Sequence, residues 1–354
     1  MQCGQGQGAS AEDLLSQKGI GIQGANGMSR EPSVLHADQA HAAQAHAAEV
    51  LAVNLIAVLV AVSEDQPRVL TIGGNALPSG PFELAHRSLQ SGLRDWVEQQ
   101  THHPIGYVEQ LYTFADRDRG GGEGARMVSI SYLGLTRERP AMATDATPEW
   151  RDWYSFFPWE DRRQGASAVD SALKAGLRAW IANAAGPALR REREQRCAIA
   201  FGFDSQAWNE ELVLQRYELL FEAGLIPEAR HAAPQTGAQT IPGQTIPGQA
   251  MTGDHRRILA TAMARLRAKI KYRPVVFELL PETFTLLQLQ RSVEALAGRL
   301  VHKQNFRRLI EQQDLVEDTG AIATGTGGRP AKLVRFRRAI QAERAVAGTK
   351  LPRP

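Results

Sequence analysis

The sequence is poor in cysteine: its 354 residues contain only two, Cys3 and Cys197. Such a low count does not support the disulfide framework of a small secreted domain, nor a zinc site built from cysteine ligands. We therefore expect a protein of the reducing cytoplasm.

The sequence also lacks a segment suited to a membrane. Its one long apolar run, residues 50–62, contains Asn54 and is shorter than the roughly 20 residues that a transmembrane helix needs. The N-terminus lacks the charged start and the apolar stretch of a signal peptide. We expect no membrane partner, and we interpret the run as a buried strand.

Net charge is low, at +3, because unlike parts of the chain cancel. Residues 254–340 contain 17 Lys and Arg against 8 Asp and Glu, a net charge of +9. The preceding 253 residues have a net charge of −8 and the last 14 have +2. Such concentrated basicity favours a nucleic-acid partner for the C-terminal part.

Composition divides the chain into two domains with tails and a linker. Residues 1–48 are rich in Gly, Gln, Ala and Ser, which predicts a disordered or weakly helical tail. Thr-Ile-Pro-Gly-Gln occurs twice between 240 and 249, so 227–253 is expected to be a linker. The predicted domains are then 49–226 and 254–340, each long enough for its own core, and 341–354 is a second tail.

The basic domain has the pattern of a helix-turn-helix. The segment 285–288 has the spacing of a capping box, and the apolar residues after it recur at helical intervals until Gly298. In the next helix, Phe306, Leu309 and Ile310 are expected to share the inward face. The glycine-rich 327–332 and the alternating 333–337 are typical of a wing and its closing strand.

The outward side chains of the second helix are the expected DNA readers. Arg307 or Arg308 could bind a guanine edge with two hydrogen bonds, whereas Gln or Asn could pair with adenine. Phosphate contacts are expected from lysines and arginines of the helix start and wing, and Arg329 should reach the minor groove. The predicted DNA-binding residues are Lys303, Gln304, Asn305, Arg307, Arg308, Arg329, Lys332 and Arg335. A solvated basic helical domain, serving dimerisation, is the alternative.

The acidic domain begins with alternating strands and helices. Strands are expected at 52–62 and 68–72 around a turn at 63–65, followed by a helix at about 82–100. Further helices are expected at 167–184 and 210–223, where they could supply a dimer interface.

The first of these helices carries a degenerate signature. Counted from Gly80, five residues precede His86, and seven more precede 94–101, which is the frame of the Nudix signature. That signature gathers carboxylates on one helical face, where they hold a divalent metal against a diphosphate. Asp95 and Glu98 remain, but His86 and Gln99 replace two carboxylates. An ordinary amphipathic helix buried by its apolar face is the alternative.

The segments 108–119 and 126–133 are similar to the strand, loop and returning strand that follow this helix in ADP-ribose-type Nudix proteins. With the winged helix after them, the order of parts resembles the Nudix-related transcriptional regulators of NAD metabolism, especially the alphaproteobacterial NAD regulator branch. The resemblance covers about 50–340 without the linker, and it is most specific at 274–281, 305–308 and 327–330. It implies an α+β fold, with a Nudix-like α/β/α sandwich domain followed by a winged helix-turn-helix domain.

The same resemblance implies a repressor of NAD biosynthesis genes that binds a palindromic operator in double-stranded DNA as a homodimer. Its effector would be NAD, ADP-ribose or ATP. We expect no catalytic residue, no required cofactor and no metal site, although the two remaining carboxylates could hold a weak magnesium ion. The expected effector-binding residues are Arg94, Asp95, Glu98, Tyr112, Phe114, Arg117 and Arg119.

Alternatives remain open for these assignments. Arg94 could simply pair with Glu98, and Tyr112 and Phe114 could be core residues of a strand. The aromatic segment 150–163 could wall an adenine or nicotinamide site, or it could pack against the sheet or a dimer partner. For the whole chain, the rival interpretations are a Nudix hydrolase of ADP-ribose or a related dinucleotide with a nucleic-acid-binding appendage, and an RNA-binding protein.

Overall fold

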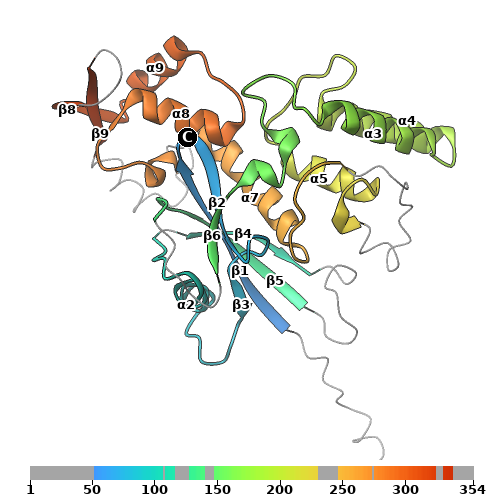
Figure 1. Ribbon diagram of the computed structural model, residues 1–354, viewed down its shortest axis with the longest axis horizontal. Helices are drawn as coiled ribbons and strands as arrows, with labels where there is room; N and C mark the ends of the chain where they lie inside the picture. Colours follow the sequence, from blue (N-terminus) through green and yellow to red (C-terminus); the bar gives the residue numbers. More distant parts are fainter. Residues whose placement is uncertain are drawn as a thin grey trace, which may run out of the picture. The chain divides into compact units, whose positions relative to one another are not determined.

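Figure 1 shows a computed structural model of the protein. It describes residues 52–106, 108–115, 127–139, 147–229, 246–272, 275–323 and 330–337. The predicted tails, 1–48 and 341–354, and most of the predicted linker lie outside these residues. The boundaries of the domains therefore stay predictions.

The first part of the chain forms a mixed sheet. Its strands follow the order β4-β5-β1-β2-β6, and β3 pairs separately with β1. The central strand β1 runs parallel to β5 and antiparallel to β2, to which it is joined by a tight turn with positive φ at Glu64 and Asp65. The predicted strands and turn are thus confirmed. The strands are β1 (Ala52–Ser63), β2 (Gln66–Ile72), β3 (Ser79–Pro81), β4 (Val108–Phe114), β5 (Met127–Leu135) and β6 (Pro148–Asp152).

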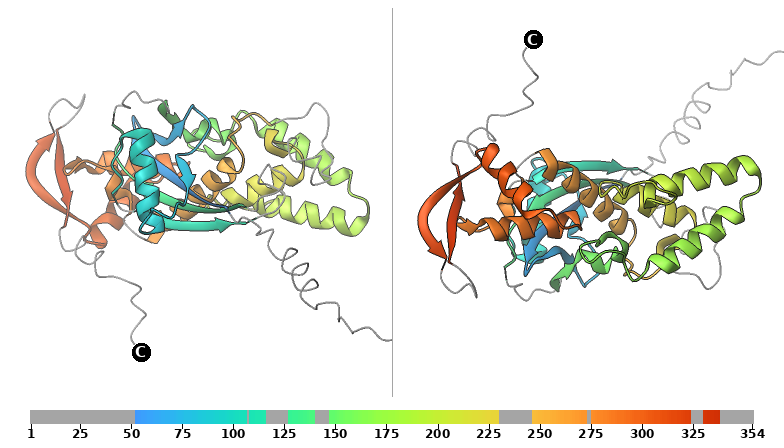
Figure 2. Two further views of the ribbon diagram at one scale, coloured as in Figure 1. Left: turned by 90° about the horizontal axis from the view of Figure 1, so that it is seen from below. Right: turned by 90° about the horizontal axis from the view of Figure 1, so that it is seen from above.

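Helix α2 (Leu89–Thr101) covers one face of this sheet, as the left view of Figure 2 shows. Leu93 and Val97 on the helix pack against Leu55 and Ala57 of β1. The helix begins seven residues later than predicted, because the side chain of Ser88 accepts a hydrogen bond from the Ser91 N–H and forms a capping box there. The prediction of a helix from residue 82 was wrong at this end.

The opposite face of the sheet is covered by α7 (His255–Tyr272) and α8 (Leu286–Ala297). Side chains alternate along β1, so Ile56, Val58 and Val60 join this second core while their neighbours face α2. The sheet therefore lies between helices in three layers, as the predicted α/β/α arrangement requires.

The helices α3 (Asp170–Ala182), α4 (Pro187–Phe201) and α5 (Val213–Glu222) follow the sheet in the sequence and precede α7. The predicted helices at 167–184 and 210–223 are confirmed with shorter ends. Helix α4 was not predicted. It lies beside α3 as the second arm of a helical hairpin (Figure 2), starts with proline at its first turn and ends at Gly202, whose φ is 66°.

The aromatic segment between β6 and α3 is part of the core. Trp153, Phe156, Phe157 and Trp159 are all completely buried, in two short 3-10 helices, η1 (Trp153–Ser155) and η2 (Pro158–Glu160), and between them. Of the two alternatives for this segment, packing is the one the structure adopts.

The C-terminal part folds as a winged helix. Helix α8 is followed by α9 (Lys303–Gln312), and a three-stranded sheet of order β7-β9-β8 completes the unit. The capping box is present: Thr285 accepts a hydrogen bond from the Gln288 N–H, and the Gln288 side chain returns to the Thr285 N–H. The strands are β7 (Phe284–Thr285), β8 (Val316–Ala323) and β9 (Ala331–Phe336), and the 3-10 helix η3 (Val275–Leu279) precedes them.

The predicted α+β fold class is confirmed by these two parts. Among the residues that the structure describes, each helix is too short or too polar to cross a membrane.

Candidate DNA-binding surface and effector site

Helix α9 presents a polar face to solvent. Phe306 and Ile310 are buried, with exposed fractions of 8% and 7%, and they fix the helix against α8. The residues between and before them are exposed: Lys303, Gln304, Asn305, Arg307 and Arg308. The structure therefore brings five predicted DNA-binding residues together on one helix.

Leu309 does not share the inward face, and this prediction was wrong: its exposed fraction is 46%. Each residue advances a helix by about 100°, so Leu309 lies about 100° round the axis from Ile310. Phe306 and Ile310, four residues apart, define the buried face of the helix. Leu309 lies at the edge of that face.

The first turn of α9 is open to an anion. The side chain of His302, the N-cap residue, makes no capping hydrogen bond within the described part of the chain. Helix N-termini with free N–H groups attract phosphates. Lys303 is the first residue of the helix, so a positive side chain and the helix start lie at the same point.

The turn between the two helices is held by a carboxylate that the sequence did not single out. Glu294 is 8% exposed, and its Oε1 accepts hydrogen bonds from the Val301 N–H and from Gln290 Nε2, both at 3.0 Å. Gly298 ends α8 with a φ of 70°. A glutamate in the last turn of a helix, followed by glycine, was the only signal available for this role.

Strands β8 and β9 form the wing. Lys332 Nζ lies 2.9 Å from Asp318 Oδ2, and Arg335 Nε lies 2.6 Å from Glu317 Oε1. Hydrogen bonds from the Gly320 N–H and from Lys332 lower the pKa of Asp318. Exposed ion pairs of this kind are weak, so a phosphate could exchange for either carboxylate. The third predicted wing residue, Arg329, lies outside the described residues.

The degenerate signature lies on α2 and on the loop before it. Asp95 and Glu98 are exposed on the helix, as a shared metal or effector contact would require. The guanidinium of Arg94 donates to the carbonyl oxygens of Ile105 and Gly106, and it thereby holds the loop after the helix. Its contact with an effector stays a prediction.

His86, in the position of the first missing carboxylate, has a structural role. Its Nδ1 accepts a hydrogen bond of 2.9 Å from the Glu83 N–H, and its ring stacks on Phe82 at 5.8 Å. Trp96 closes the same loop, since its Nε1 donates to the Pro81 carbonyl oxygen at 2.8 Å. Its indole also covers Gly80 so closely that a Cβ at residue 80 would collide with it.

Of the two predicted aromatic contacts, only Tyr112 offers its ring to a ligand. Its exposed fraction is 58%, whereas that of Phe114 is 5%. Phe114 belongs to the core, and the guanidinium carbon of Arg257 lies 5.0 Å from the centre of its ring. The alternative of a core strand residue is therefore correct for Phe114. Arg117 and Arg119 lie outside the described residues.

Carboxylates do not cluster strongly anywhere in the described ranges. No group of three or more His, Cys, Asp or Glu side chains there is arranged to hold a metal ion. A metal at α2 would have Asp95 and Glu98 as its candidate protein ligands.

The C-terminal part is similar to a known family of DNA-binding domains. Residues 276–336 match the model of the NrtR DNA-binding winged helix domain. This part of the chain is therefore similar to an NrtR-type winged helix. The NrtR match begins after α7 and extends from η3 to the end of β9, so it includes α9 and the wing.

A curated relative supports the same assignment. The chain is 39% identical over 83 residues to the ADPR responsive transcriptional repressor NtrR of Acinetobacter baylyi. The matched segment covers 23% of this chain and 33% of that repressor, so the chain spans about a third of the length of the curated relative.

Two solved structures resemble the chain more distantly. One is NrtR of Shewanella oneidensis in complex with a 27mer DNA, which has 20% identity, coverage of 82% of this chain and 95% of the other, and a TM-score of 0.48. The second is a MutT/nudix family protein of Enterococcus faecalis, with 16% identity, coverage of 87% and 95%, and a TM-score of 0.48.

Proposed function

We propose that the chain is a DNA-binding transcriptional repressor whose affinity for DNA is controlled by ADP-ribose or a related adenine nucleotide, NAD or ATP. The observation that carries the proposal is the NrtR-type winged helix, with its exposed cationic and amide side chains on α9. The name of the curated relative, an ADPR responsive transcriptional repressor, supports ADP-ribose as the first effector to test.

The effector site belongs to the Nudix-like part. Asp95 and Glu98 on α2 face solvent, and Tyr112 on β4 supplies an exposed ring on which a base could stack. Arg117 and Arg119 would supply cationic donors to a pyrophosphate. Arg94 would act through the loop that its guanidinium holds.

The repressor would act as a cytoplasmic homodimer on a palindromic operator of NAD biosynthesis genes. One winged helix contacts too few base pairs to find a site in a genome, and two related by a twofold axis read two half-sites. The resemblance to the regulators of NAD metabolism motivates the choice of genes.

Control of DNA binding would come from the geometry of the dimer. An effector that binds one spacing of the two winged helices better than another shifts the population toward that spacing. If the favoured spacing cannot reach successive major grooves, effector binding reduces the affinity for DNA. An effector with equal affinity for both spacings would change nothing.

The proposal is tested by fluorescence anisotropy with labelled promoter DNA of the NAD biosynthesis genes of the source organism, at fixed near-physiological salt. We expect a Kd at least 1000-fold lower than for random DNA of equal length, as is usual for specific regulators. Equal affinity for both DNAs, with a folded protein, would rule the repressor out.

A Nudix hydrolase is the second candidate, because Asp95 and Glu98 are retained on α2. His86 is engaged with the Glu83 N–H, and Gln99 replaces another carboxylate, so we propose that the chain is not an enzyme. The test is to incubate the protein with ADP-ribose and magnesium and to measure AMP. Release of AMP at an ordinary enzymatic rate would reverse this preference.

A further inference from the structure

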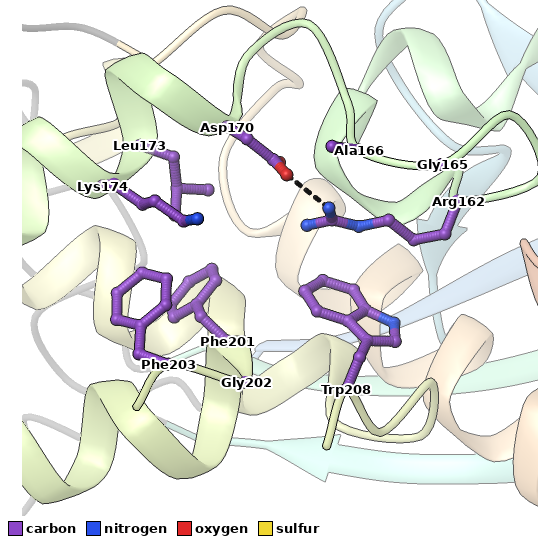
Figure 3. Close-up of a pocket in the computed structure, with 10 residues that line it drawn as sticks. All are labelled: Arg162, Gly165, Ala166, Asp170, Leu173, Lys174, Phe201, Gly202, Phe203 and Trp208. Atoms are coloured by element: carbon purple, nitrogen blue, oxygen red, sulfur yellow. Dashed lines mark hydrogen bonds and ion pairs between the residues drawn. The ribbon is translucent and has the colours of Figure 1, made fainter. Parts of the chain in front are cut away.

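A pocket that the proposed function does not use lies among α3, the end of α4 and the loops on either side of them (Figure 3). Its volume is about 370 Å³, which is within the range of small-molecule sites. Its lining includes Arg162, Asp170, Lys174, Phe201, Phe203 and Trp208.

One side of the pocket is aromatic. Phe201 and Phe203 lie 5.9 Å apart with their rings 25° from parallel, and the indole of Trp208 stands beside them in Figure 3. Leu173 approaches from α3, above the phenylalanine rings in the same view. A flat apolar ring would find edge-to-face aromatic partners on this surface.

The opposite side carries a net positive charge. Arg162 forms an ion pair with Asp170, which leaves the charge of Lys174 as the surplus. Lys174 Nζ lies 5.8 Å from the centre of the Phe203 ring, so a ligand ring on the aromatic side would bring a substituent within reach of the ammonium group.

Polar atoms at the pocket are left without partners. Arg162 Nε and Asp170 Oδ1 are shielded from solvent, and within the described part of the chain neither has a hydrogen-bond partner. Buried polar atoms are nearly always hydrogen-bonded in native proteins. Because both atoms are shielded, a ligand would reach them only if a side chain of the pocket moved.

We propose that the pocket is a second ligand site, which binds a small planar aromatic carboxylate. The ring lies against the edges of Phe201, Phe203 and Trp208, and the carboxylate accepts a hydrogen bond from Lys174. The surplus positive charge selects an anion over a cation, and the aromatic surface selects a ring over a small inorganic anion.

The pocket is connected to the winged helix by a backbone hydrogen bond. The Arg162 N–H donates to the Gly298 carbonyl oxygen, at the end of α8, with a distance of 2.6 Å. Trp208 lies between two guanidinium groups, 4.1 Å from that of Arg162 and 3.9 Å from that of Arg216. A ligand that displaces Trp208 or Arg162 thus acts on the turn before α9. This regulatory consequence rests on the proposed function.

The first experiment is isothermal titration calorimetry of the full chain with naphthalene-1-carboxylate as the probe and 1-naphthylmethylamine as the cationic counterpart. We expect saturable binding of the carboxylate and at least ten-fold weaker binding of the amine. Equal binding of both probes, or no saturable binding of the carboxylate, would overturn the site.

A pair of variants locates the binding. Lys174→Met should weaken the binding of naphthalene-1-carboxylate at least five-fold, because it removes the cationic donor. Arg178→Met is the matched control, since Arg178 is also exposed on α3 but does not line the pocket. It should bind as the wild type does. Equal affinity of Lys174→Met and the wild type, with both proteins folded by circular dichroism, would contradict the assignment to this pocket.

The second experiment separates the site from its regulatory consequence. Promoter DNA is titrated with the protein in the absence and presence of saturating naphthalene-1-carboxylate. We expect the Kd for DNA to change at least three-fold in the wild type and not in Lys174→Met. An unchanged Kd would overturn the proposed effect of the pocket on DNA binding, but not the proposal that the pocket binds the carboxylate. Lack of specific DNA binding without the probe would instead overturn the proposed function.

Discussion

His255 is held neutral in the fold. Its Nδ1 accepts a hydrogen bond of 2.8 Å from the Leu77 N–H, and burial lowers its pKa from 6.5 to about 4. The unfolded chain takes up a proton below pH 6.5 and the folded chain does not, so stability is complete above that pH and falls as the pH drops toward 4. We predict that the contribution of His255 to the free energy of unfolding is about 2 kcal/mol lower at pH 5 than at pH 7.

Urea denaturation at the two pH values measures this difference. His255→Gln retains a hydrogen-bond acceptor but cannot titrate, so the variant should lose about this part of the pH dependence. The same pH dependence in the variant as in the wild type would show that His255 is not its source.

Lys303, at the start of α9, belongs to the predicted phosphate contacts. We predict that Lys303→Ala weakens binding to promoter and random DNA alike and reduces the slope of log K against log salt by about 0.9, the value for one phosphate contact. Arg178→Ala removes an exposed charge outside the winged helix and should leave the slope unchanged. An equal slope for Lys303→Ala and the wild type would argue against the phosphate contact.

The burial of individual residues could be predicted where their spacing in the sequence determines which face of a helix they occupy. The four-residue step from Phe306 to Ile310 correctly predicted their burial, whereas Leu309, at the edge of the buried face, was misassigned. Phe114 could not be assigned from alternation alone, because a strand pattern does not say which face of the sheet α7 covers. The hydrogen bonds of Arg94 to backbone beyond the end of α2 could not be predicted, because they have no sequence pattern.

Among the secondary-structure elements, α8 depends on the glycine that follows its last residue. Gly298 has a φ of 70°, and a Cβ there would lie 2.8 Å from Arg267 Nη2 and 2.9 Å from the Tyr154 hydroxyl. We predict that Gly298→Ala lowers the free energy of unfolding by about 2–5 kcal/mol, from left-handed strain and overpacking together.

Gly253→Ala is the matched control for this effect. Gly253 also has a positive φ, of 52°, but a Cβ there would meet open space. Its substitution should cost about 1–2 kcal/mol from the backbone alone. Urea denaturation of both variants measures the difference, and equal losses would show that the close approach at Gly298 is unimportant.

Elements were predictable where local signals were complete. The apolar run of β1 and the capping box of α8 each determined an element. Helix α4 was missed because its sequence is highly charged and only Cys197, Ala200 and Phe201 near its end are buried. The start of α2 was placed too early because the capping box at Ser88 uses a second serine rather than the usual Glu or Gln.

At the scale of the whole molecule, a buried ionic cluster joins segments that are distant in the sequence. Glu160 Oε1 and Oε2 accept hydrogen bonds from Arg216 Nε at 2.6 Å and Nη2 at 2.8 Å, and Oε2 also accepts one from Arg267 at 2.6 Å. Burial opposes the charge of Glu160, but the two guanidiniums outweigh it and lower its pKa. Arg267 also donates to the Leu296 carbonyl oxygen, in the last turn of α8.

We predict that Glu160→Gln lowers the free energy of unfolding by about 3–5 kcal/mol, because it leaves two buried guanidiniums without a countercharge. Glu222→Gln is the control: Glu222 pairs with Arg196 at the surface, and its loss should cost less than about 1 kcal/mol. Similar losses in the two variants, measured by urea denaturation, would contradict a structural role for the cluster.

The division of charge along the sequence indicated a DNA-binding part. It did not indicate how that part packs against the rest of the chain. One hydrophobic core runs from the sheet strand β1 through α5 and α7 to α9. Composition could not show this continuity, because the contacts depend on the apolar faces of helices that are separated by linkers and turns. The burial of the charged residues in the ionic cluster could not be predicted either, because Glu and Arg usually lie on solvated surfaces.

Regulated DNA binding is tested by the affinity of the purified chain for promoter DNA of NAD biosynthesis genes, measured at fixed salt with and without ADP-ribose. We predict specific binding whose Kd changes at least ten-fold when ADP-ribose is saturating. Specific binding that neither ADP-ribose, NAD nor ATP alters would contradict the claim that this winged helix is controlled by an adenine nucleotide.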